Sequence, residues 1–272
     1  MRIADEMLAL LDDALRGAPV PKVRALHLPP APWSGKREGE FGAIELDDGS
    51  LGLSYVLLDG LLDKLASDAR GGGAAAGGLI GADAALRTIG FAAVNALTRH
   101  LYDRAGFVPP PAADSIGGLA PRAGEHIGMI GYFPPLVNQV TASGARLTVL
   151  ELREDLAGAR DGFHITLDAR ELRACDKVLS TSTVLLNDTL DAVLEQCANA
   201  KAFAMIGPGA SCLPDALFAR GVTLIGGAWI ERSDGFKQAL GNGAPWGPHA
   251  RKFALARENY PGIAALLAAG HG

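Results

Sequence analysis

Cysteine is scarce in this chain, because only Cys175, Cys197 and Cys212 occur among its 272 residues. Their number is odd and no CxxC pair is present, which excludes a disulfide framework and the ligand spacing of a structural zinc site. Each thiol is therefore expected to be a small buried apolar group. Aromatic residues are also few, at 6% of the chain, so aliphatic side chains and alanine must fill most of the core.

Runs of basic residues and long apolar stretches are absent as well. The formal net charge is −5, and no cluster of lysine or arginine offers a binding surface for nucleic acid or an anionic membrane. No apolar run approaches the roughly 20 residues of a bilayer-spanning helix. Acidic residues interrupt the apolar pattern of residues 1–17, unlike in a secretory signal. We expect a cytoplasmic protein without nucleic-acid or membrane partners, and a homodimer as the commonest assembly.

Recognised catalytic signatures are missing too. The sequence contains no GxSxG, no HExxH and no P-loop, and no nucleophile–base pair is visible. The dinucleotide-binding pattern GxGxxG is also absent, so no segment is specified that would cradle a pyrophosphate. The residues alone therefore assign no reaction, and whether the chain is an enzyme stays open.

The chain divides into two halves at a proline-rich segment. Apolar spacing in the first half predicts, in order, a helix at 3–16, a strand at 20–28, a hairpin at 41–46 and 51–57, and helices at 61–69 and 82–105. Three prolines at 109–111 cannot continue a helix and stiffen a connection. We place the domain boundary near residue 112, with a smaller α+β domain over 1–112 and an α/β domain over 113–272.

The second half alternates short apolar runs with helical stretches. Strands are predicted at 126–132, 146–150, 177–180, 202–206 and 222–225, and helices at 135–143, 188–196 and 214–220. This alternation favours βαβ units and a Rossmann-like parallel sheet. Ligands of such sheets bind beyond the carboxyl ends of the strands. The loops that follow the strands are therefore the first place to look for a site.

Small and hydroxyl-bearing residues gather in these strand-end loops. The candidates for ligand binding are Gly131, Tyr132, Phe133, Glu151, Thr181, Thr183, Asn187, Gly207 and Ser211. Glu151 stands 20 residues after Gly131, about where dinucleotide-binding folds place an acid on ribose hydroxyls. Plainer explanations remain open: a tight strand-to-helix turn, helix capping by hydroxyl and amide side chains, and ordinary glycine packing.

Direct metal ligation would need thiolate, imidazole or carboxylate groups. Glu151, Cys212 and His249 are the candidates, although no two of them stand at a ligand spacing. A lone cysteine in a loop is more often buried than reactive, and His249 is equally compatible with a surface loop. Asn95 is a further candidate, because an amide on an otherwise apolar helix needs a partner. That partner could be a ligand between the domains or a buried structural hydrogen bond.

Three segments of the second half also carry a family resemblance. GMIGYFPPL at 128–136, TSTVLLNDT at 181–189 and GPGASC at 207–212 resemble, in this order and spacing, a bacterial and archaeal family of unknown function labelled for heavy-metal chelation. The hairpin at 41–57 and FAAVNAL at 91–97 extend the resemblance into the first half. Two departures stand out: Ser182 replaces an expected glycine, and residues 209–211 replace a Ser/Thr-Pro type sequence.

The resemblance implies a fold and a role. The fold would be an enolase-N-terminal-like α+β domain joined to a Rossmann-like domain, with a ligand site in the cleft between them. The ligand would be a transition metal ion, a metal chelate or a molecule used in metal handling. The alternative from the residues is an enzyme that binds a nucleotide or adenosine-type cofactor at the strand ends, for which Glu151 is the main support. A non-catalytic assembly protein is the remaining option.

Overall fold

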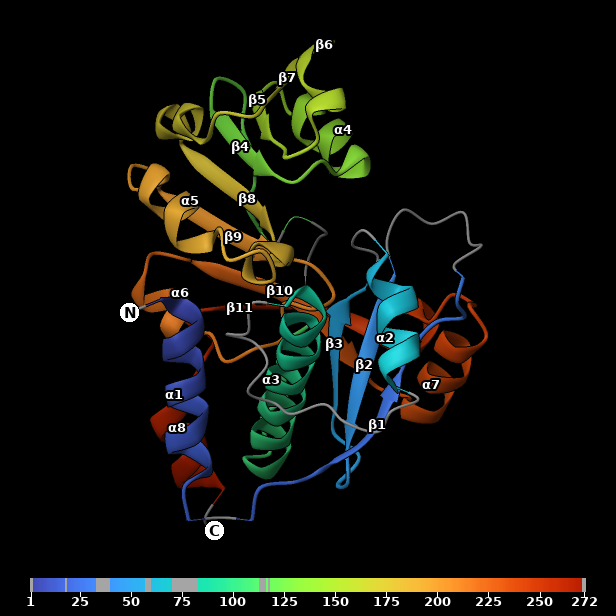
Figure 1. The fold of residues 1–272 in the computed structure, drawn as a ribbon. Helices are drawn as coiled ribbons and strands as arrows, with labels where there is room; N and C mark the ends of the chain where they lie inside the picture. Colours follow the sequence, from blue (N-terminus) through green and yellow to red (C-terminus); the bar gives the residue numbers. More distant parts are fainter. Residues whose placement is uncertain are drawn as a thin grey trace.

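The computed structural model describes residues 2–17, 19–32, 40–56, 60–69, 83–112, 116 and 118–270. The long helix α3 (Ala84–Arg104) lies beside the smaller of two sheets, and the larger sheet extends from its upper end in Figure 1. The smaller sheet is antiparallel with the order β1-β2-β3, where β1 is Val23–His27, β2 is Phe41–Leu46 and β3 is Leu51–Tyr55. The tight turn at residues 47–50 joins β2 to β3, as the Asp-Gly signal predicts.

The larger sheet has eight strands in the order β11-β10-β9-β8-β4-β5-β7-β6. Its strands are β4 His126–Ile130, β5 Arg146–Leu150, β6 Gly158–Arg160, β7 Phe163–Thr166, β8 Lys177–Thr181, β9 Ala202–Ile206, β10 Leu224–Ile230 and β11 Ala250–Ala256. The six central strands are parallel, and antiparallel β6 and β11 close the two edges. The core strands β4 and β5 are apolar runs because parallel strands are covered on both faces.

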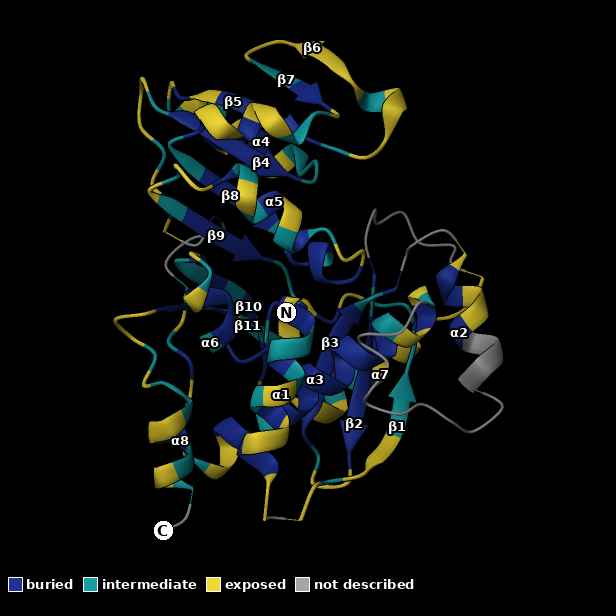
Figure 2. Cartoon of the chain, turned by 60° about the vertical axis from the view of Figure 1, so that its left-hand side comes forward, coloured by how far each residue is buried: buried dark blue, intermediate teal, exposed yellow. Residues whose placement is uncertain are grey.

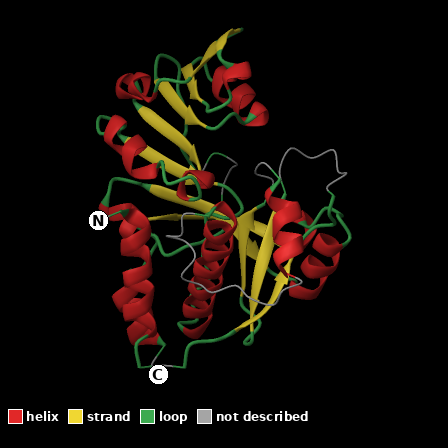
Figure 3. Ribbon diagram, in the orientation of Figure 1, coloured by secondary structure: helices red, strands yellow, loops and turns green. Residues whose placement is uncertain are grey.

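Short helices cover both sheets (Figure 3). The remaining α-helices are α1 Ile3–Leu15, α2 Leu61–Ala69, α4 Pro134–Ala142, α5 Leu190–Gln196, α6 Asp215–Ala219, α7 Ser233–Gly241 and α8 Ile263–Ala269, and the 3-10 helices are η2 Glu154–Leu156, η3 Ala169–Ala174, η4 Ser182–Leu185 and η5 Gly247–His249. Helix α1 packs on α3 and α6, and α8 packs on α3. Within the part of the chain that the structure describes, no helix is long and apolar enough to cross a membrane.

Helix α3 is buried along most of its length (Figure 2). Asp83 caps its N-terminus by accepting hydrogen bonds from the backbone N–H groups of Ala85 and Leu86. On β3, Gly52 allows the helix backbone to approach very closely, because a Cβ there would lie 2.1 Å from Ala96 N and 2.2 Å from Ala92 O. The alanine-rich sequence of this helix therefore serves close contact with a sheet rather than an amphipathic surface.

Helix α3 meets the larger sheet along a seam rich in the chain's few aromatic residues. Tyr102 of α3 stacks on Trp229 of β10 with ring centroids 6.5 Å apart, and it meets Phe107 edge-on at 5.0 Å. Tyr260 adds contacts to Tyr102 and to Phe218 of α6. The predicted linker also joins the larger sheet, since Ala112 N donates to Lys252 O and Ala254 N donates to the carbonyl of Pro110.

The two-domain α/β architecture agrees with the sequence prediction, whereas several peripheral elements were not predicted. The strands predicted at 146–150 and 202–206 have the bounds of β5 and β9, and β10 extends to Ile230 rather than ending at 225. The antiparallel edge strands β6 and β11, the parallel strand β7 and the helices α7 and α8 were missed. Edge elements carry mixed polar and apolar residues, so their periodicity is weak.

Substituting Gly52→Ala should destabilise the fold by about 3 kcal/mol or more, because the added methyl group would collide with helix backbone rather than with a flexible side chain. The matched control is Gly241→Ala in α7, where an added Cβ meets nothing within 4 Å. That control should be neutral or stabilising by roughly 0.5–1 kcal/mol. Urea unfolding of both variants tests this, and equal midpoints would contradict the close packing of α3 on β3.

Glu45 of β2 should make stability depend on pH. Burial alone would raise the pKa of its carboxyl, but hydrogen bonds from His27 and from Lys237 of α7 outweigh burial and hold the pKa below its ordinary value. Because its pKa is lowered on folding, ionised Glu45 stabilises the fold at pH values above its unfolded-state pKa of 4.5. This stabilisation disappears as the pH falls through the folded-state pKa.

The urea midpoint of the wild type should therefore exceed that of Glu45→Gln by a constant amount above about pH 5 and converge with it below pH 4.5. Asp103→Asn provides a control, because its partner Arg99 lies on the same helix and the carboxylate is 47% exposed. A Glu45→Gln difference that persisted unchanged at pH 3 would contradict the assignment.

Candidate functional site

The larger sheet has its topological switch point between β4 and β8. β4 is the first strand in sequence, the chain then moves to β5 and β7 on one side, and it returns to β8, β9 and β10 on the other. The loops that leave the carboxyl ends of β4 and β8 therefore diverge, which is where Rossmann-like folds bind ligands. Gly131–Phe133 follow β4, and Thr181–Thr183 follow β8.

Glycines let these strand-end loops pack directly on one another. Gly131 has φ +86°, and a Cβ there would lie 3.2 Å from the Thr181 methyl group. Gly207, after β9, has φ +143°, and its Cβ would lie 2.8 Å from Ser182 Oγ. Both glycines thus have a conformational and a packing cause. The structure therefore packs the strand-end residues Gly131, Thr181, Ser182 and Gly207 closely against one another. We call this group the floor.

Glu151 holds the loop after β4 in place. Its Oε2 accepts a hydrogen bond from Tyr132 N at 3.0 Å, and its Oε1 accepts one from Leu152 N at 2.7 Å. The ring of Tyr132 stacks on Phe163 of β7 with centroids 6.2 Å apart. The carboxylate that the sequence predicts to bind ribose therefore accepts hydrogen bonds from two backbone N–H groups, one just after β4 and one just after β5.

The start of α4 offers no phosphate cradle. Pro134 and Pro135 occupy the first helical positions and have no N–H. The next two backbone N–H groups, of Leu136 and Val137, both donate to Phe133 O at 2.9 Å. An anion at a helix N-terminus requires free N–H groups. The first turn of this helix supplies none.

Hydroxyl and amide groups after β8 are engaged in local turns. Thr181 Oγ1 accepts a hydrogen bond from Thr183 N at 3.2 Å and lies 3.0 Å from Thr183 Oγ1. Asn187 is exposed, and its Oδ1 accepts hydrogen bonds from the backbone N–H and the hydroxyl of Thr189. These contacts match the capping explanation that the sequence left open.

The loop after β9 connects the floor to the first domain. Gly209 packs against Leu53 of β3 and Phe91 of α3. The side chain of Asn95 joins the three elements, since Nδ2 donates to Leu53 O at 2.7 Å and to Gly209 O at 2.8 Å. Asn95 is 1% exposed. The predicted amide on the apolar helix is therefore a bridge between the domains.

A pocket opens beside this bridge. It draws on both domains, and as it stands it has room for about one water molecule. The residues that line it are Leu51, Leu53, Asn95, Arg99, Tyr102, Ser211, Ala228, Trp229, Ile230 and Phe253. Of the predicted residues, Asn95 and Ser211 meet here, whereas Gly131, Glu151 and Thr183 do not line the pocket. We call this space the interdomain pocket.

One polar atom at the interdomain pocket lacks a partner. Because both carbonyl contacts of Asn95 require an N–H donor, its amide orientation is fixed, and Oδ1 is buried without a hydrogen bond to any described residue. Leaving such an acceptor unpaired costs about 1–3 kcal/mol. Ser211 Oγ has only long contacts, 3.4 Å to Pro208 O and 3.4 Å to Ala228 O. The pocket can therefore still accept and donate hydrogen bonds.

Sequence reasoning missed Arg99 and Trp229 in this pocket. The guanidinium carbon of Arg99 lies 3.7 Å from the centroid of the Trp229 ring, which is a cation–π contact. Arg99 follows Asn95 by four residues and so shares its helix face, which was the available signal. No local pattern indicated Trp229, because only the pairing of β10 with its neighbours places it there.

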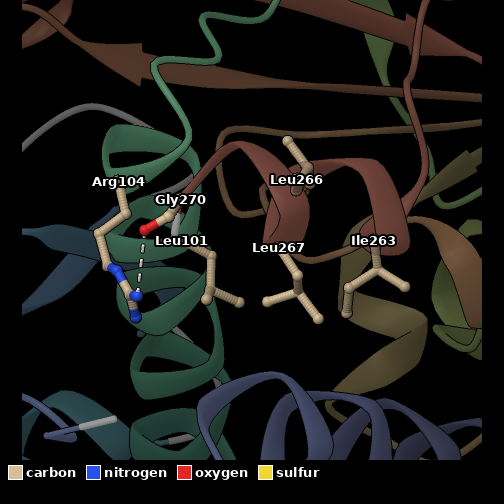
Figure 4. Close-up of a pocket in the computed structure, with 6 residues that line it drawn as sticks. All are labelled: Leu101, Arg104, Ile263, Leu266, Leu267 and Gly270. Carbon is tan, nitrogen blue, oxygen red and sulfur yellow. Dashed lines mark hydrogen bonds between the residues drawn. The ribbon is translucent and has the colours of Figure 1, made fainter. Parts of the chain in front are cut away.

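A second hollow lies between α3 and α8 (Figure 4). Its walls are mainly aliphatic, from Leu101, Ile263, Leu266 and Leu267, and Arg104 donates to Gly270 O at 3.5 Å. This contact satisfies a carbonyl at the end of α8. The groove offers packing between helices and little that would recognise a polar ligand.

The three predicted metal ligands do not form a cluster. Glu151 follows β5 and His249 precedes β11, so five strand spacings of about 4.8 Å separate them, roughly 24 Å. His249 instead packs over Gly235 of α7. Cys212 is 2% exposed, and burial raises the pKa of its thiol to about 12. Among the described residues, no three His, Cys, Asp or Glu side chains could hold one metal ion.

Comparison with known proteins identifies related sequences. A family model for DUF364, described as "putative heavy-metal chelation", matches residues 117–258. An uncharacterized protein of Methanocaldococcus jannaschii is 31% identical over 143 residues, which are 51% of this chain and 52% of the relative. The chain thus spans about half the length of this curated relative.

Two solved structures of unknown function from DUF364 share the fold. The protein from Desulfitobacterium hafniense is 20% identical with a TM-score of 0.66, over 93% of this chain and 99% of that one. The protein from Pyrococcus horikoshii is 19% identical with a TM-score of 0.60, over 94% of this chain and 98% of that one. At these identities the similarity concerns the fold alone.

All three thiols should resist modification in the folded protein. Cys175, Cys197 and Cys212 are buried, and burial raises their thiol pKa values to about 11, 12 and 12. An aromatic disulfide reagent at pH 8 should therefore label none of them before guanidinium is added and all three afterwards. Rapid labelling of Cys212 in the native protein would contradict its placement.

Proposed function

This chain belongs to the DUF364 family, and on that premise we propose that it binds a small polar molecule in the interdomain pocket. The observation that carries the proposal is the buried Oδ1 of Asn95, which lacks a partner in a pocket that both domains line. A ligand that donates a hydrogen bond there would recover the cost of the unpaired acceptor. Ligand pockets typically combine apolar walls with a few oriented polar groups, as these walls do.

The family description concerns metals, and we propose that a metal reaches this protein as a complex with its organic ligand. Soft metals prefer thiolate and imidazole ligands. The thiols of this chain are buried and protonated, because burial raises their pKa values, and Glu151, Cys212 and His249 are spread over separate elements. A chelating small molecule would supply the metal ligands itself, while the protein recognises the organic part.

The strand-end loops would then position the pocket wall. Gly207 is fixed against Ser182 at one end of the loop after β9, while Gly209 and Ser211 face the first domain at the other. The closely packed floor therefore sets where Ser211 meets Asn95. In this role Gly131, Thr181 and Thr183 act through the floor and not by touching the ligand.

A nucleotide-type cofactor receives less support. Its main basis was Glu151, which bonds to the backbone of Tyr132 and Leu152. The proline start of α4 also leaves no N–H groups free for phosphate oxygens in its first turn. Retention of an adenosine compound by the purified protein is therefore the competing outcome of the experiment.

The test is to identify what the purified chain carries. Untagged protein is analysed by elemental mass spectrometry, and the supernatant after denaturation by small-molecule mass spectrometry. We expect a released organic molecule, with or without an equivalent of metal. Ala228→Leu should lose it, because the larger side chain fills the pocket while Asn95 keeps its two hydrogen bonds. Asn187→Ala, at an exposed cap, should retain it.

Two results would overturn the proposal. A stoichiometric metal without an organic molecule, lost in Glu151→Ala, Cys212→Ser or His249→Ala but kept in Ala228→Leu, would favour direct chelation. A retained adenosine compound unaffected by Ala228→Leu would favour the cofactor alternative. If both analyses are empty, a thermal-shift panel of small polar molecules and their metal complexes decides, since binding raises the unfolding temperature by mass action.

A further inference from the structure

Resting on the proposed function, we infer that the ligand of the interdomain pocket is a small carboxylate with a hydroxyl or amino group on the neighbouring carbon. Such α-hydroxy and α-amino acids combine an anionic end with a hydrogen-bond donor. The pocket presents a fixed cation and an unpaired acceptor one helical turn apart, at Arg99 and Asn95.

The cation is held rigidly. Arg99 Nε donates to both carboxylate oxygens of Asp103 at 2.7 and 2.9 Å, and Nη1 donates to Ile230 O at 3.0 Å. The guanidinium lies over the Trp229 ring. These contacts leave Nη2 without a hydrogen bond to a described residue. A guanidinium fixed in this way loses little conformational entropy when it binds a carboxylate.

A second arginine lies on the same face of the sheet. Arg251 of β11 pairs directly with Trp229 in the antiparallel ladder, so both side chains point to one side, and its guanidinium carbon lies 6.0 Å from the ring centroid. Arg251 Nη2 donates to Pro109 O, but Nη1 is buried without a partner. A buried, unpaired N–H donor therefore lies near Trp229, although Arg251 itself does not line the interdomain pocket.

The acidic partners of these arginines lie nearer to solvent. The side chains of Arg99 and Arg251 are each 23% exposed, whereas those of Asp103 and Glu231 are 47% and 52% exposed. Water screens the two carboxylates more than the two guanidiniums. The protein interior around Trp229 therefore favours an anion.

The amide oxygen of Asn95 specifies the second group. It can only accept a hydrogen bond, so the ligand must carry an N–H or O–H donor. Because Asn95 and Arg99 are neighbours on one helix face, the donor must lie close to the carboxylate. The apolar walls from Leu51, Leu53 and Phe253 suit a short aliphatic remainder.

The pocket must widen for binding, because as it stands it has room for about one water molecule. Asn95 Oδ1 has almost no contact with solvent, so a ligand reaches it only when α3 or the loop after β9 gives way. Adjacent carboxylate and hydroxyl or amino groups also chelate metal ions, which connects this ligand class to the proposed function.

The experiment compares four matched molecules by thermal shift and calorimetric titration of the full chain. Lactate and alanine carry both groups, propionate lacks the donor, and lactamide lacks the negative charge. We expect lactate or alanine to bind at least about tenfold more tightly than propionate and lactamide. Arg99→Gln should weaken lactate or alanine by a similar factor without changing lactamide. Arg104→Gln, on the same helix but outside this pocket, should leave all affinities unchanged.

The outcomes separate the two proposals. If lactamide binds as well as lactate and Ala228→Leu abolishes both, the pocket binds polar molecules and only the carboxylate inference fails. If propionate equals lactate, the role of Asn95 fails. If none of the four molecules shifts the unfolding temperature at 10 mM, or if Ala228→Leu leaves binding intact, this ligand class is wrong for the pocket. The molecule released from the purified chain then decides the proposed function separately.

Discussion

The side-chain amide of Asn95 is the interaction on which the arrangement of the two domains depends. Its two N–H groups bond to a carbonyl of β3 and to a carbonyl of the loop after β9. A buried amide that loses these partners would leave two backbone acceptors unpaired in a region without solvent. These two hydrogen bonds therefore fix the position of helix α3 relative to the small sheet and to the loop after β9.

That network works only because α3 approaches its neighbours so closely. Gly52 removes the side chain that would separate β3 from the helix backbone, and alanines occupy the facing positions. Aromatic rings then fill the wider part of the seam, around Tyr102 and Trp229. In a chain with only 6% aromatic residues, several of them gather at this junction and add their buried area and ring contacts to it.

The sequence predicts those features that depend on residues close together in the chain, and not those that depend on strand pairing. Strands β5 and β9 were predicted with their bounds because buried parallel strands read as uninterrupted apolar runs. Asn95 stood out because an amide on an apolar helix demands a partner. Trp229 and Arg251 could not be connected to it, because their proximity comes from the pairing of β10 with β11, and β11 carries no clear periodicity. Similarly, Glu151 occupies the expected position after β5, but only coordinates reveal that it bonds to the β4 loop.

The bridging role of Asn95 by itself explains why its side-chain oxygen is unpaired, without a ligand. Only an amide side chain donates two hydrogen bonds while remaining neutral, so any residue suited to the bridge carries an idle acceptor. A buried lysine would avoid the acceptor but would cost far more as an isolated charge. What this explanation does not cover is Arg251, whose Nη1 is a buried donor without a partner beside the same tryptophan. Each of these two unpaired groups is expensive, but only Asn95 lines the interdomain pocket, so the ligand argument depends on its oxygen together with the cation of Arg99.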